Sequence, residues 1–178
     1  MSTTKTAVIY TIGHSTHSIE VFLSMLQSFD IKTVVDIRRF PGSRKYPQYD
    51  QENLKNSLEK ARIQYIHLVD LGGRRKADKD SKNTVWKNES FRGYADYMET
   101  EAFAKAVEEL KQIALKQTTA YMCSEAVWWR CHRSMVSDYL KAKGWNVLHI
   151  MNIAKVQEHK YTAPARIFNE KVFYSEEK

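Results

Sequence analysis

The stretch AVIYTIGHSTHSIEVFLSMLQSF, from Ala7 to Phe29, decides the fold. Its first seven residues are mostly apolar and end in a glycine, which predicts a buried strand over 7–13. Its second part opens on Ser18, a good N-cap residue, and then repeats apolar residues at helical spacing: Ile19, Phe22, Leu23, Leu26 and Phe29. A buried strand followed by an amphipathic helix is the repeating unit of a parallel sheet.

The same alternation continues along the chain. Further strands are predicted over 33–37, 64–68, 119–123 and 145–150. Further helices are predicted to start at Asp50, at Thr100 and near Arg133, the last one ending at Gly144. We therefore predict one α/β domain over residues 1–178, with a mostly parallel sheet of about five strands flanked by helices. Its core should span 7–150 and its C-terminal tail is polar, whereas 69–90 shows no period and is predicted to be a lid or binding loop.

Composition limits the class of protein. The 178 residues include 28 Lys and Arg against 21 Asp and Glu, a net charge of +7 that favours a polyanionic partner or serves solubility. The two cysteines are too few for a secreted disulfide framework and fit a reducing compartment. The sequence shows neither a signal peptide nor an 18-residue apolar run. We expect a soluble cytoplasmic domain that contacts no membrane.

Polar and reactive residues follow four of the predicted strands. They are Gly13-His14-Ser15, then Asp36-Ile-Arg38-Arg39, then Leu71-Gly72-Gly73-Arg74-Arg75, and finally Cys123-Ser124-Glu125. In open α/β sheets, ligands bind outside the carboxyl ends of the strands. The sequence therefore predicts a ligand site at this edge.

Two of these residues have more than one interpretation. His14 follows a glycine and has two interpretations. It serves as an acid, a base or a hydrogen-bond donor to phosphate, or it is a turn histidine bonded to the backbone. Asp36 lies in an apolar strand beside Arg38, so its carboxylate must be paired. A structural ion pair and a catalytic carboxylate both satisfy that need.

Two segments mix cations with aromatic residues. The loop 40–49 contains Arg44, Lys45 and Tyr46, a mixture that suits phosphates and stacked bases or that forms a solvated turn. Residues 122–133 hold Trp128 and Trp129 before Arg130-Cys-His-Arg133 at a helix start, where backbone N–H groups favour an anion. Either one tryptophan faces the site or both are core.

Three other kinds of chemistry fit the sequence less well. A cysteine phosphatase or sulfurtransferase needs a tight loop between its cysteine and arginine, usually of five residues, but six separate Cys123 from Arg130 and none is glycine. Metal binding by Cys123, Cys131 and His132 lacks closely paired ligands. We therefore expect no metal and no cofactor.

Five ordered motifs carry a family resemblance: Thr11–Ser15, Asp36–Arg44, Leu71–Arg75, Phe91–Met98 and Cys123–Arg133. Together they resemble the family of the domain of unknown function 488 over roughly residues 8–150. This resemblance implies a compact α/β domain. It also implies a connection of part of the family with nucleic acid, including the removal of alkylated pyrimidine bases from DNA.

Our first hypothesis is therefore a DNA N-glycosylase, which must flip a base, stack it and hold phosphates. Its catalytic candidates are Asp36, Glu125, His14 and His132. Its substrate-binding candidates are Ser15, Arg38, Arg39, Arg44, Tyr46, Gly72, Gly73, Arg74, Arg75, Cys123, Trp128, Trp129, Arg130 and Arg133. A lyase step would need an amine, for which Lys45 is a candidate. The alternatives are a hydrolase on a small phosphorylated or nucleotide substrate, using Cys123 or His14, and a non-catalytic nucleic-acid-binding module.

Overall fold

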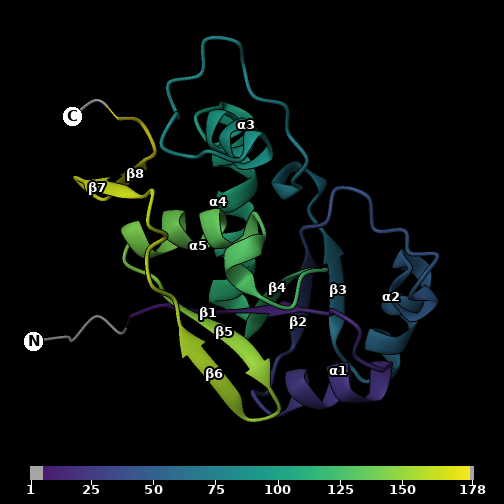
Figure 1. The fold of residues 1–178 in the computed structure, drawn as a ribbon. Coiled ribbons are helices and arrows are strands. Elements are labelled where there is room, and N and C mark those ends of the chain that lie inside the picture. The colour runs from purple at the N-terminus through teal and green to yellow at the C-terminus, as the bar shows by residue number, and fades with distance from the viewer. Residues whose placement is uncertain (1–5, 177–178) are drawn as a thin grey trace, which may run out of the picture.

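A six-stranded sheet forms the centre of the structure, a computed structural model that describes residues 6–176 (Figure 1). The strand order is β3-β2-β4-β1-β5-β6, and all neighbours are parallel except β5 and β6. The strands are β1 (Val8–Gly13), β2 (Thr33–Asp36), β3 (Gln64–His67), β4 (Thr119–Cys123), β5 (Asn146–Asn152) and β6 (Lys155–Glu158). This confirms the predicted α/β fold with a mostly parallel sheet.

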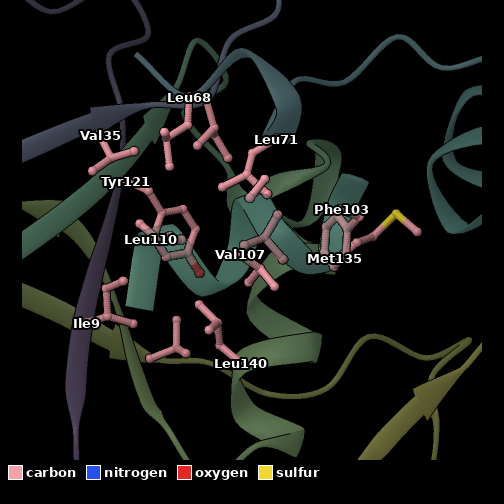
Figure 2. Close-up of a cluster of buried hydrophobic side chains, with 14 of the residues drawn as sticks. Ile9, Val35, Leu68, Leu71, Phe103, Val107, Leu110, Tyr121, Met135 and Leu140 are labelled. Atoms are coloured by element: carbon pink, nitrogen blue, oxygen red, sulfur yellow. The ribbon is translucent and has the colours of Figure 1, made fainter. Parts of the chain in front are cut away.

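Helices cover both faces of the sheet (Figure 1). The helices are α1 (Ile19–Gln27), α2 (Gln51–Lys60), α3 (Glu89–Tyr97), α4 (Glu101–Lys116) and α5 (Arg133–Ala142). One core cluster packs α1 and α2 on the sheet through side chains such as Phe22 and Leu54. The other packs α4 and α5 on the opposite face, where Val107 and Leu140 lie near Tyr121 (Figure 2).

Local signals set most of the predicted helix ends, whereas the prediction that the Asp50 side chain caps its helix is wrong. The hydroxyl of Ser18 accepts a hydrogen bond from the backbone N–H of Val21, and that of Thr100 accepts one from Phe103. Asp50 precedes α2 without capping it through its side chain. Helix α5 ends just before Gly144, whose φ of 92° is readily adopted only by glycine.

The C-terminal segment has more structure than its polar sequence indicates. Strand β6 pairs antiparallel with β5, and a two-stranded sheet follows, made of β7 (Arg166–Phe168) and β8 (Lys171–Phe173). Tyr174 is buried in the core cluster of α4 and α5. The domain's packed core therefore extends beyond residue 150.

The segment 69–90 is largely irregular, as predicted. It contains only the short 3-10 helix η2 (Val69–Leu71) and the first residues of α3, a helix that the sequence pattern did not indicate. Two further 3-10 helices, η1 (Pro47–Tyr49) and η3 (Trp128–Arg130), precede α2 and α5. Within residues 6–176, no helix is long and apolar enough to cross a membrane.

Candidate functional site

A cavity of about 560 Å³ opens at the carboxyl ends of β1, β2 and β4. These strands are neighbours in the sheet, so the segments that follow them meet at one edge. Eleven of the residues predicted for the site line this cavity: His14, Ser15, Arg38, Arg39, Tyr46, Gly73, Arg74, Cys123, Glu125, Arg130 and His132. Arg44, Lys45, Gly72 and Arg75 are not part of the lining.

The segments after β1 and β4 run side by side beneath the cavity. The backbone N–H groups of His14 and Ser15 donate to the carbonyl groups of Cys123 and Ser124, over 3.0 and 2.9 Å. A Cβ atom on Gly13 would lie only 1.7 Å from the carbonyl oxygen of Glu125. Glycine at this position therefore lets the two segments approach and form the floor of the site.

Asp36 is fully buried and paired. Its carboxylate accepts two hydrogen bonds from the Arg38 guanidinium, from Nε over 2.9 Å and from Nη2 over 2.8 Å, and a third from the Tyr65 hydroxyl over 2.6 Å. The backbone N–H of Arg38 also donates to it. Asp36 does not line the cavity, so the geometry favours the structural ion pair over the catalytic carboxylate.

His14 reaches the cavity as a neutral imidazole. Burial lowers its pKa to about 4, with the charge of Arg38 acting in the same direction. Its Nδ1 donates to the carbonyl of Ser15 over 2.9 Å, because a carbonyl can only accept, and its ring stacks on Tyr49. The structure therefore shows the predicted bond of His14 to the backbone, and a role as acid, base or phosphate contact stays a prediction.

The buried neutral state of His14 predicts acid sensitivity of the fold. The ordinary pKa of histidine is about 6.5, so between pH 6.5 and 4 the unfolded chain binds a proton at His14 that the folded chain does not. The free energy of unfolding therefore keeps its full value, as far as His14 is concerned, above pH 6.5. It falls by up to about 3 kcal/mol as the pH falls to 4. Urea unfolding of the wild type and of His14→Gln at pH 7, 5 and 4 measures this contribution. Equal pH dependence in the two proteins would refute it.

The cavity lining is strongly cationic. Within the described chain it contains four arginines and one carboxylate, that of Glu125. Arg39 donates from Nη1 to the carbonyl of Arg74, and both guanidinium groups lie near the Phe40 ring. Arg74 and Arg130 are exposed. This arrangement suits an anionic ligand.

The two tryptophans do not line the cavity. Trp128 is buried and stacks on His149 at 4.6 Å, and its indole N–H donates to the side chain of Gln157. Trp129 is 49% exposed and meets Trp128 edge to face. The η3 turn directs Trp128 toward β5 and β6, so the prediction that one tryptophan faces the site is wrong for the cavity itself.

Two arginines predicted to bind phosphate serve the fold instead. Arg133 is almost fully buried, and its Nη2 donates to the carbonyl of Glu125 over 2.9 Å. Arg75 donates to the carbonyl of Gly72, and its guanidinium lies 3.7 Å from the centre of the Tyr97 ring. Both hold loops that carry the lining residues.

Part of the aromatic lining comes from an element that the sequence analysis did not assign to the site. Phe91 and Tyr94 belong to α3, whereas Phe40 and Tyr46 lie in the predicted loop 40–49. Phe91 and Tyr94 lie in the family motif 91–98, which was the one available signal for them. Across residues 6–176, no group of three or more histidine, cysteine or carboxylate side chains is arranged to hold a metal ion.

The family model of the domain of unknown function DUF488 matches residues 18–140. The chain belongs to this family. No curated protein and no solved structure matches the chain. The DUF488 match includes the arginines and Glu125 of the cavity, while His14 and Ser15 precede it.

Proposed function

We propose that this DUF488 domain is a DNA N-glycosylase that removes a damaged base by hydrolysis. The observation that carries the proposal is Glu125, the one carboxylate among the described residues that line a cavity of arginines and aromatic rings. A base-excising enzyme must take the base out of the stack, hold it against rings and hold the phosphates of its strand. The cavity offers groups for each of these tasks.

Each group has a specific role in the proposed reaction. Arg39, Arg74 and Arg130 hold phosphates, and Phe40 and Tyr46 stack against the extruded base. Glu125 stabilises the cationic sugar and takes a proton from water. The bond from C1′ to the base nitrogen breaks, water oxygen adds to C1′, and the proton that Glu125 took from water leaves on the base.

The nucleophile in this proposal is water rather than an amine. The described lining of the cavity includes no lysine. The candidate amine, Lys45, instead has its Nζ 5.6 Å from the centre of the Tyr46 ring. We therefore propose base release without strand cleavage.

A panel of oligonucleotides, each with one modified base, tests the proposal by chromatography of the released base. We expect release from at least one modified oligonucleotide and intact strands. The size of the cavity also suits a single nucleotide, which supports a nucleotide hydrolase as a second candidate. Release from mononucleotides alone would establish that candidate and overturn the first.

Salt dependence tests the phosphate contacts separately. For duplex DNA, each contact adds about 0.9 to the slope of log affinity against log salt concentration. We expect Arg74→Ala and Arg130→Ala each to lower this slope by about 0.9 and to weaken binding for all sequences. Lys60→Ala is the control, because Lys60 ends α2 beside the amino end of β3, at the opposite edge of the sheet. Fluorescence anisotropy at several salt concentrations measures the slope, and equal slopes in all variants would refute the contacts.

A further inference from the structure

Two cysteine side chains meet on the wall of the cavity. Cys123 is the last residue of β4, and Cys131 lies between η3 and α5. Their Sγ atoms are 2.7 Å apart, and both residues line the cavity. Both thiols are free in the structure. The fold thus brings two reduced sulfurs into direct contact beside a space that admits small molecules.

The surroundings of Cys131 stabilise a thiolate. Burial opposes ionisation of Cys131, but its hydrogen bond with Cys123 and the positive charge of Arg133 outweigh it and lower the pKa. The backbone N–H of Arg133 donates to Cys131 Sγ over 3.4 Å. The described acceptors of the Arg133 guanidinium are Thr11 and the carbonyls of Glu125 and Ala126, so none of its described hydrogen bonds goes to a carboxylate.

Cys123 has the opposite character. Burial raises the pKa of its thiol well above the ordinary value. Its Sγ faces the carbonyl oxygen of Glu125 at 3.9 Å, an acceptor rather than a donor. Cys123 is therefore the weaker acid of the two thiols, and Cys131 is the one that loses its proton more readily.

His132 offers the Cys131 thiol a hydrogen-bond acceptor. Its Nε2 lies 3.0 Å from the carbonyl of Ile37 and must donate to it, because a carbonyl only accepts. Nδ1 is then the unprotonated nitrogen, and it lies 3.5 Å from Cys131 Sγ. Burial lowers the pKa of the imidazole, so His132 stays neutral and its Nδ1 can accept a hydrogen bond from the Cys131 thiol without taking the proton itself.

We propose that Cys131 and Cys123 are a peroxide-reactive pair that closes to a reversible disulfide. The Cys131 thiol gives up its proton and its sulfur attacks one oxygen of a hydroperoxide. The O–O bond breaks, and the alcohol or water leaves with the proton that Cys131 gave up. Cys131 then carries a sulfenic acid. The sulfur of Cys123 attacks the sulfur of Cys131, the S–O bond breaks, and water leaves with the Cys123 proton. Two thiols and one hydroperoxide thus give a disulfide, an alcohol or water, and one further water.

This proposal does not depend on the substrate of the cavity. It requires only that a hydroperoxide enter, that Cys131 react first and that Cys123 reach it. The contact of 2.7 Å between the two sulfurs meets the last requirement. Alkylation of free thiols and mass spectrometry follow the reaction without any assay of DNA.

The experiment uses the full reduced chain, freed of reductant and treated with a few equivalents of hydrogen peroxide. We expect wild type to lose two hydrogen atoms within one chain, to resist alkylation and to regain both thiols with dithiothreitol. Cys123→Ser should instead gain one oxygen at Cys131, trapped by dimedone. Cys131→Ser should oxidise at least about tenfold more slowly, because the remaining thiol is protonated.

Three results would overturn the proposal. They are a wild type that keeps both thiols, a disulfide that links two chains, and a Cys131→Ser variant that oxidises as fast as wild type. Circular dichroism of both variants checks that they fold. The wild-type experiment alone decides whether the disulfide forms. It can therefore refute the proposal even if one of the variants fails to fold.

Discussion

The Asp36→Asn variant is expected to lose about 3–5 kcal/mol of its free energy of unfolding, because the substitution leaves a buried guanidinium without its counterion. Arg38 is only 8% exposed, and Asp36 is fully buried. An asparagine there would also turn an amide N–H₂ or a single neutral oxygen toward the donors of Arg38 and Tyr65. For a chain of this length the loss corresponds to a decrease in Tm of about 10 °C.

Asp70→Asn is the matched control, because Asp70 is exposed in η2. Its backbone carbonyl accepts a hydrogen bond from the Tyr97 hydroxyl, and no described side chain pairs with its carboxylate. Urea unfolding of both variants compares the two sites. A stable Asp36→Asn variant without activity would restore Asp36 as a catalytic carboxylate. A stable and active one would show that Arg38 tolerates the loss of its partner.

The position of the site could be predicted from the sequence because it depends on topology. Parallel strands end at one edge, so reactive residues after four successive strands had to lie near one another. The sheet places β3, β2, β4 and β1 side by side, which brings these ends together more closely than the sequence could show. Strand order itself depends on long-range pairing and leaves no local pattern.

The roles of individual side chains were less predictable, because they depend on single turns. Asp36 and Arg38 are two residues apart, a spacing that is equally compatible with a buried pair and an open site. The direction of Trp128 is set by the η3 turn and by its stacking on His149, which lies 21 residues further along the chain. Neither contact has a signal in the local sequence.

The C-terminal segment shows the same limit on a larger scale. His159 lies between His149 and Asp138, with its ring nitrogens 2.8 Å from a nitrogen of His149 and from the carboxylate of Asp138. That carboxylate also accepts from the hydroxyls of Thr162 and Tyr174. These residues are polar and scattered in the sequence, so their pattern predicts a solvated tail. Their mutual hydrogen bonds allow them to be buried.

The Glu125→Gln variant is expected to release the base about 10²–10⁴-fold more slowly than wild type, the range for loss of a general acid or base. The exposed side chain of Glu125 can change without disturbing the fold. Its backbone carbonyl, which accepts from Arg133, is unaffected. Single-turnover kinetics on the oligonucleotide identified by the panel would measure the rate of base release, and circular dichroism would check the fold.

DNA affinity separates a catalytic role of Glu125 from a binding role. Glutamine removes a negative charge from a cavity that we propose holds phosphates, so the variant should bind DNA as tightly as wild type or more tightly. Glu109→Gln is the control, an exposed carboxylate on α4 outside the cavity lining, and it should change neither the rate nor the affinity. A rate loss matched by an equal loss of affinity would assign Glu125 to binding. An unchanged rate would remove the only carboxylate of the described lining from the reaction, and with it the hydrolytic mechanism proposed for this cavity.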